Sequence, residues 1–99
     1  MTYAIPIKDI FQLINQDVVL IDIRDIYQYR QQHIQNFINI PYDQIKKYQF
    51  SYDKPIYLLC SSGEQAKKCA LELRQLNYQA YYIEGGMKAF LSVYQNKYF

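Results

Sequence analysis

The chain has 99 residues, which is enough for one domain with a hydrophobic core, because a chain of this size buries roughly two-thirds of its unfolded surface. Hydrophobic residues make up 51% of it, which argues against intrinsic disorder. The formal net charge is only +2, and the basic residues are scattered among acids, so we expect no nucleic-acid partner.

The sequence also carries no sign of export or of a membrane span. Its amino terminus lacks the charged and apolar regions of a signal peptide, and no apolar run approaches the length that crosses a bilayer. Two cysteines without a secretory signal favour a reducing compartment, so we expect a cytoplasmic protein with no membrane partner. Cys60 and Cys69 form neither a CxxC pair nor part of a metal-ligand cluster, and we expect no metal and no cofactor.

Strands and helices alternate along the first half of the chain. The run from Val18 to Ile23 is β-branched and apolar on both faces until Asp22, as in a central parallel strand. Asp25 is placed to cap a short helix, with Ile26 and Tyr29 directed inward. The predicted elements are a strand over 3–5, a helix over 7–15, a strand over 18–23, a helix ending near 32, a turn over 33–36, a strand over 37–40 and a helical turn over 44–48.

The same alternation continues to the carboxyl end. Ala66, Cys69, Ala70 and Leu73 recur at helical spacing, which places Cys69 in the core, on a helix that ends near Asn77. The other predicted elements are a buried strand ending at Cys60, a strand over 80–83, a turn over 84–86 and a helix over 87–94. Alternating strands and helices predict an α/β domain built on a parallel sheet.

Cys60 is the residue around which we expect chemistry. It ends the apolar run that follows Pro55, and the small polar loop Ser61-Ser62-Gly63 separates it from the next helix. Ligands of parallel α/β sheets bind at this edge, and the unpaired N–H groups at a helix start favour a thiolate. The alternative is a buried strand cysteine that acts only as a small hydrophobic residue.

Three segments match motifs of a known family in the expected order. Residues 19–25, with Tyr29 and His33-Ile34, match its amino-proximal motif, and residues 59–63 match its active-site loop. Residues 82–90 match its carboxy-proximal motif, with Phe90 where Trp is usual. Together these segments resemble a single-domain rhodanese, a sulfurtransferase. The resemblance implies one three-layer α/β/α domain over residues 1–99, with a central parallel sheet of about five strands.

The resemblance also implies a mechanism. Cys60 would take the outer sulfur of a donor such as thiosulfate as a persulfide, and cyanide or a cellular thiol would then accept that sulfur. The backbone amides of the loop would bind the anionic sulfur. The implied binding residues are Ser61, Ser62, Gly63, Glu64, Gln65 and Ala66. The implied partners are a small sulfur donor and a thiol or cyanide acceptor, with a protein sulfur donor or acceptor as the alternative.

The loop departs from the family pattern at two places. The family often has Arg at the sixth position counted from the cysteine, frequently followed by Ser, and this chain has Gln65 and Ala66 there. Glu64 adds a carboxylate beside the proposed anion site, where like charges about 6 Å apart repel by about 2–3 kcal/mol at an effective dielectric of about 20. We expect weak thiosulfate binding if Glu64 faces the site, whereas a solvated Glu64 would favour the helix dipole.

Two functional hypotheses remain open. One is a sulfurtransferase that uses Cys60, and the other is a sulfur-relay or protein-binding module with little or no activity on free thiosulfate. Phosphatases related to the rhodanese fold are excluded, because they need an arginine to hold phosphate where this chain has Ala66.

Five further residues belong to the motifs and are expected to act mainly in the architecture. Asp22 and Arg24 are placed to tie the strand to its loop by an ion pair, with a direct catalytic role as the alternative. His33 is expected to form a structural hydrogen bond, with a general base as the alternative. Gly85 and Gly86 form a turn that needs unusual dihedral angles.

Overall fold

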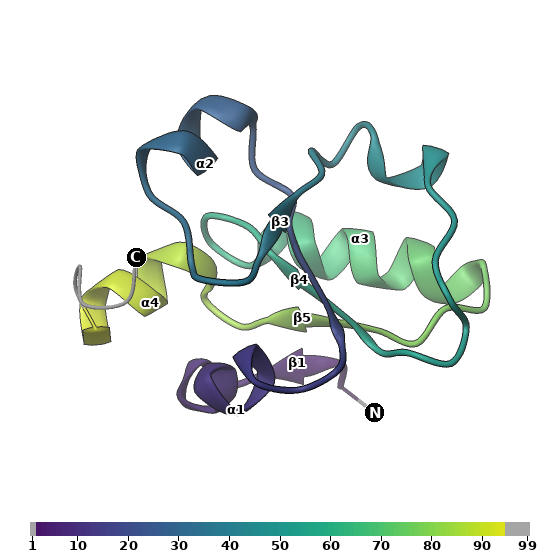
Figure 1. Ribbon diagram of the computed structural model, residues 1–99, viewed down its shortest axis with the longest axis horizontal. Helices are drawn as coiled ribbons and strands as arrows, with labels where there is room; N and C mark the ends of the chain where they lie inside the picture. The colour runs from purple at the N-terminus through teal and green to yellow at the C-terminus, as the bar shows by residue number, and fades with distance from the viewer. Residues whose placement is uncertain (1, 95–99) are drawn as a thin grey trace.

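The computed structural model describes residues 2–94, which form one five-stranded sheet covered by helices (Figure 1). Its elements are β1 (Ala4–Ile5), the 3-10 turn η1 (Ile7–Asp9), α1 (Ile10–Ile14), β2 (Val19–Asp22), α2 (Ile26–Gln31), β3 (Ile38–Asn39), the 3-10 turn η2 (Ile45–Lys47), β4 (Ile56–Leu59), α3 (Glu64–Gln75), β5 (Ala80–Ile83) and α4 (Gly86–Tyr94). All neighbouring strands pair in parallel, in the order β1-β5-β4-β2-β3. The predicted parallel sheet of about five strands is therefore confirmed.

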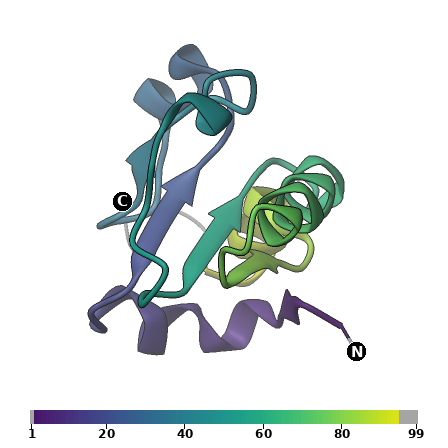
Figure 2. The same cartoon turned by 90° about the vertical axis from the view of Figure 1, so that its right-hand side faces the viewer.

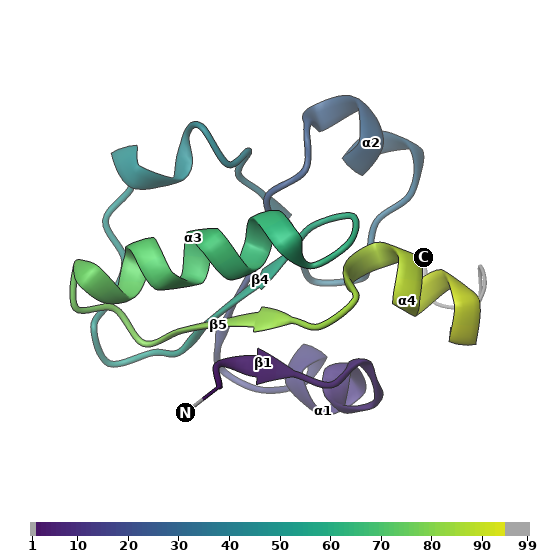
Figure 3. The ribbon, with the colours of Figure 1, turned by 180° about the vertical axis from the view of Figure 1, so that it is seen from behind.

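The two faces of the sheet bury separate sets of side chains, because successive residues of a strand point to opposite faces. Ile56 and Leu58 of β4 pack with the buried stripe of α3, whereas Leu59 packs with residues of α1 and α4. Figure 3 shows α3 lying across one face, and Figure 1 shows α1 on the other. The edge view in Figure 2 separates the same layers. The predicted three-layer α/β/α arrangement is confirmed.

The ends of α3 follow from local backbone chemistry. At its start Gly63 adopts φ +94°, a left-handed conformation that glycine accepts readily. At its end Asn77 adopts φ +72°, and the N–H groups of Asn77 and Tyr78 bond to the carbonyls of Arg74 and Leu73 at 2.9 and 3.1 Å. This is a Schellman closure. It confirms the predicted helix end near Asn77.

The first two helices differ in detail from their predictions. The helix predicted over 7–15 is a 3-10 turn followed by the short α1, because Asp9 and Ile10 bond to carbonyls three residues back. Asp25 caps α2 as predicted, accepting the Gln28 N–H at 3.0 Å. The inward orientation predicted for Ile26 is wrong, since its side chain is 38% exposed and α2 has no buried residue.

The strand order reverses between β2 and β4. From β2 the chain moves outward to β3, then returns to the other side of β2 as β4 and continues outward to β5. In open α/β sheets, ligands bind beyond the carboxyl ends of the strands at such a reversal. Within residues 2–94, no helix has the length and apolar character needed to cross a bilayer.

Candidate active site

Cys60 lies directly after β4, at the carboxyl edge of the sheet, and only 3% of it is exposed. The backbone N–H groups of Gly63 and Ala66 donate to its Sγ at 3.1 and 3.3 Å. Gly63 cannot be replaced without strain, because a Cβ there would lie 3.0 Å from the nitrogen of Gly85 and φ is +94°. Two fixed donors therefore converge on the sulfur, an arrangement that stabilises negative charge on it.

A pocket of about 470 Å³ lies in front of this sulfur. Its walls come from the segments that follow β2, β3 and β4. The carboxyl ends of these strands lie at the same height in the sheet, because Asp22 is in register with both Asn39 and Leu59. The lining residues are Ile23, Arg24, Asp25, Gln28, Pro41, Tyr42, Asp43, Cys60, Ser61, Ser62, Glu64 and Gln65. The pocket thus occupies the place where the strand order reverses.

The six loop residues singled out from the sequence divide into two groups. Gly63 and Ala66 are buried and direct their N–H groups at Sγ. The other four residues line the pocket. Ser61 is half-buried, and the exposed residues are Ser62, Glu64 and Gln65. Glu64 is therefore both exposed to solvent and part of the pocket wall.

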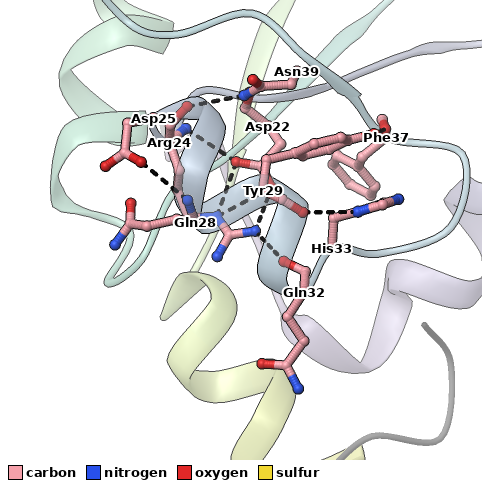
Figure 4. Close-up of polar contacts among 9 residues, drawn as sticks. All are labelled: Asp22, Arg24, Asp25, Gln28, Tyr29, Gln32, His33, Phe37 and Asn39. Atoms are coloured by element: carbon pink, nitrogen blue, oxygen red, sulfur yellow. Dashed lines mark hydrogen bonds and ion pairs between the residues drawn. The ribbon is translucent and has the colours of Figure 1, made fainter.

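Asp22 and Arg24 form a buried ion pair beside the pocket (Figure 4). Arg24 Nη2 lies 2.8 Å from Asp22 Oδ2, and Arg24 Nε donates to both carboxylate oxygens at 3.0 and 3.1 Å. Arg24 Nη2 also donates to the Gln32 carbonyl at 2.6 Å, while the Asn39 amide bonds to the carbonyls of both pair members at 3.0 and 2.9 Å. The pair thus joins the end of β2 to α2 and β3, and Arg24 also reaches the pocket wall.

The turn at Gly85 and Gly86 lies behind the Cys60 loop, and neither glycine belongs to the pocket lining. Their φ angles are +77° and +59°, as the predicted turn requires.

His33 also lies outside the pocket lining. Its Nδ1 is 2.8 Å from the Tyr29 carbonyl, and its ring stacks on the Tyr29 ring with centroids 4.0 Å apart. Tyr29 in turn donates its hydroxyl to the Phe37 carbonyl, which Figure 4 also shows.

Two groups near the site remain protonated at neutral pH. Tyr42, in the pocket wall, donates its hydroxyl to Glu72 Oε1 at 2.6 Å, and this bond raises the pKa of Tyr42 to about 12. Cys69 is fully buried on α3, and burial, together with the nearby Glu72 carboxylate, raises the pKa of its thiol to about 12. The prediction that Cys69 lies in the core is therefore confirmed. Among residues 2–94, no group of three or more His, Cys, Asp or Glu side chains could hold a metal ion.

Residues 8–92 match the family profile of the rhodanese-like domain. The chain belongs to the rhodanese-like domain family. It is 35% identical over 72 residues to YqhL of Bacillus subtilis (strain 168), a match that covers 70% of this chain and 57% of that protein. It is 31% identical over 80 residues to the tRNA uridine(34) hydroxylase of Cronobacter sakazakii (strain ATCC BAA-894), covering 72% and 23%. The chain thus spans less than two thirds of either curated relative.

Solved structures of rhodanese-like domains superpose closely on this one. The reduced CoADR-RHD protein of Bacillus anthracis gives a TM-score of 0.86 at 26% identity, covering 93% of this chain and 17% of that one. A rhodanese-related protein of Thermoplasma volcanium gives 0.83 at 22% identity, covering 92% of both chains. The rhodanese-like domain protein of Staphylococcus aureus gives 0.82 at 24% identity, covering 91% of both.

Half of the pocket wall of this rhodanese-like domain was not predicted from the sequence. The wall residues that the sequence analysis does not predict are Ile23, Asp25, Gln28, Pro41, Tyr42 and Asp43. A signal for five of the six was present, because they lie within four residues of the carboxyl end of β2 or β3, and parallel strands bring their carboxyl ends to one edge. The rule holds for every parallel strand of the sheet and not only for the strand that precedes Cys60.

Proposed function

We propose that this rhodanese-like domain is a sulfurtransferase that carries a sulfane sulfur as a persulfide on Cys60. The observation that supports it most is the convergence of the Gly63 and Ala66 N–H groups on Sγ at the wall of the pocket. Fixed main-chain donors stabilise a thiolate and a persulfide anion without rearranging during the reaction. Cys69 is buried and its thiol remains protonated, so it is not the nucleophile.

In the first half of the proposed reaction, the Cys60 thiolate attacks the outer sulfur of the donor. With thiosulfate, a new S–S bond forms on Cys60 while the S–S bond of the donor breaks, and its electron pair leaves with sulfite. In the second half, cyanide or a thiolate attacks the outer sulfur of the persulfide. Thiocyanate or a new persulfide leaves, and the Cys60 thiolate is regenerated, so no external oxidant or reductant is consumed.

A sulfur-relay module that receives its sulfur from a protein is the second candidate. Gln65, an exposed neutral side chain of the loop, supports it because the loop itself offers no cation to a small anionic donor. Such a module would use the same Cys60 persulfide, and free thiosulfate would be a poor donor. A cytoplasmic location, where thiols stay reduced, remains a prediction for both candidates.

The test is the intact mass of the protein after incubation with thiosulfate and, separately, with cysteine persulfide. The proposal expects a gain of one sulfur atom from at least one donor, removed again by cyanide. Cys60→Ser should gain none, whereas the matched variant Cys69→Ala should gain sulfur as the wild type does. A folded wild type that gains no sulfur from either donor, or a Cys60→Ser variant that gains it equally, would overturn the proposal.

A further inference from the structure

Three exposed carboxylates belong to the wall of the Cys60 pocket, and we call the solvent-facing part of this pocket its mouth. Asp25, Asp43 and Glu64 all line it and are all exposed, and they come from three separate segments, after β2, after β3 and at the start of α3. The whole chain has a formal net charge of +2, so this negative charge is a local property of the pocket and not of the protein.

The one cation among the described lining residues does not offset these carboxylates. Arg24 is bound through Nε and Nη2 to the buried Asp22, and the side chain of Arg24 is only 7% exposed. The Asp22–Arg24 pair is neutral as a unit. Outside the lining, Lys68 places its Nζ 5.9 Å from the centroid of the Tyr42 ring, so one lysine charge lies near a wall that carries three carboxylates.

The pocket therefore has two electrostatic zones. At the sulfur, the N–H groups of Gly63 and Ala66 favour negative charge. At the mouth, the carboxylates of Asp25, Asp43 and Glu64 favour positive charge. A nucleophile that displaces a group at sulfur approaches opposite that group, so when Cys60 attacks the outer sulfur, the rest of the donor points away from Sγ and toward the mouth. For thiosulfate that remainder is the anionic sulfite.

We propose that the mouth selects sulfur donors that carry a positive charge beside the sulfane sulfur, over anionic donors such as thiosulfate; this rests on the sulfurtransferase function proposed above. The donor class is a persulfide on an aminothiol or on a cysteine flanked by Lys or Arg. The Cys60 thiolate takes the terminal sulfur with its proton, forming an S–S bond, and the donor S–S bond breaks with its electron pair on the released thiolate. The ammonium or guanidinium of the donor then lies among the carboxylates.

The experiment measures the rate of sulfur loading on Cys60 by intact mass with three donors of similar size. These are the persulfides of cysteamine, 2-mercaptoethanol and 3-mercaptopropionate, which differ in charge. Each loading rate is divided by the rate at which the same donor transfers sulfur to a small neutral thiol in place of the protein. We expect the cationic donor to load about tenfold faster than the anionic one at about 0.01 M salt. At about 1 M salt, where the Debye length is about 3 Å, the ratio should fall below about threefold.

Charge variants test whether the carboxylates of the mouth cause the preference for cationic donors. Glu64→Gln and Asp43→Asn should each reduce the cation-to-anion ratio about twofold at low salt, because three carboxylates share the expected preference. Asp53→Asn removes a carboxylate from the loop before the opposite end of β4 and should leave the ratio unchanged. Asp25 is left intact because it caps α2.

The outcomes separate this inference from the proposed function. Loading by all three donors at equal normalised rates would overturn the charge preference and leave the persulfide function standing. Loading by none of them would also overturn the charge preference, and the function itself falls only if thiosulfate and cysteine persulfide fail to load Cys60 as well. A persulfidated peptide with lysines beside its cysteine forms a fourth arm: faster loading from it than from cysteamine persulfide assigns the preference to a protein donor, and slower loading assigns it to a small aminothiol.

Discussion

Gly86 packs so closely against Cys60 that a Cβ at position 86 would lie 2.3 Å from the Cys60 carbonyl oxygen. The two residues after Gly86 complete the contact, because Met87 and Lys88 donate their N–H groups to the carbonyls of Cys60 and Ser61 at 2.8 and 3.0 Å. The start of α4 therefore holds the Cys60 loop from behind, through main-chain bonds that depend on the absence of a side chain at position 86.

Gly86→Ala should destabilise the protein and slow the loading of sulfur on Cys60. The new methyl group meets backbone atoms that cannot rotate away, at φ +59°, so the free energy of unfolding should fall by about 2 kcal/mol or more. Denaturant titration measures the first effect and intact mass the second. Ser92→Ala, an exposed change later in α4, is the control and should stay within about 0.5 kcal/mol of the wild type. Wild-type stability of Gly86→Ala would contradict the packing described.

Asp22→Asn should cost far more stability than the same substitution at Asp17. Asp22 is fully buried, and its loss of charge leaves the buried Arg24 guanidinium without a counter-ion, which typically costs about 3–5 kcal/mol. Asp17 pairs with Lys54 at 2.9 Å, but its side chain is 86% exposed, so Asp17→Asn should change the free energy of unfolding by less than about 1 kcal/mol. Equal effects in urea titrations would show that the buried pair does not hold β2 to its neighbours.

Tyr42→Phe should weaken the protein at neutral pH, and the difference from the wild type should shrink in acid, where Glu72 is protonated in both proteins. The hydrogen bond from Tyr42 is the main cause that lowers the pKa of Glu72, followed by Lys46, so Glu72 contributes stability above its ordinary value of 4.5 and loses it as pH falls through its lowered pKa. Removing the hydroxyl moves the pKa of Glu72 upward and costs about 1 kcal/mol at neutral pH. An NMR titration of the Glu72 carboxyl carbon measures the shift, and an unchanged pKa in the variant would refute this assignment.

Cys69→Ala should make the free energy of unfolding fall less steeply as pH rises in the alkaline range. The folded pKa of the buried thiol is raised from 9.0 to about 12, so its contribution is fully present below pH 9.0 and is lost as pH rises toward about 12, where the folded thiol ionises. One such group lowers the free energy of unfolding by at most about 1.4 kcal/mol per pH unit across that window. Thermal unfolding of wild type and variant between these pH values measures the difference in slope. Parallel slopes would mean that Cys69 is not protected in the folded protein.

The local sequence was sufficient where a residue's role depends on its near neighbours. The cap at Asp25, the helix end at Asn77 and the position of Cys60 between a strand and a helix each depend on fewer than ten residues of chain. The ion pair expected for Asp22 and Arg24 is present for the same reason, since both residues lie at one strand end.

Features that depend on distant segments were not predicted. Ile26 belongs to a helix of six residues, which is too short for hydrophobic spacing to fix its inward face, whereas Ile34 and Phe37 of the following segment are buried in the core. Tyr42 and Asp43 lie opposite the Cys60 loop only because β3 and β4 flank β2. The local sequence shows only that both residues follow a strand end, and which strands lie next to each other depends on the order of the whole sheet.

The sheet order also bears on how the domain assembles as it leaves the ribosome. β1 is synthesised early, yet its neighbour among the described strands is β5, in the register Ala4 with Tyr82 and Ile5 with Ile83. β1 can pair only after almost all of the domain has emerged. Its pairing with β5 joins the two neighbouring strands that lie farthest apart in the sequence. The three strands beneath the pocket end by Leu59, so a growing chain can align them well before its first strand docks.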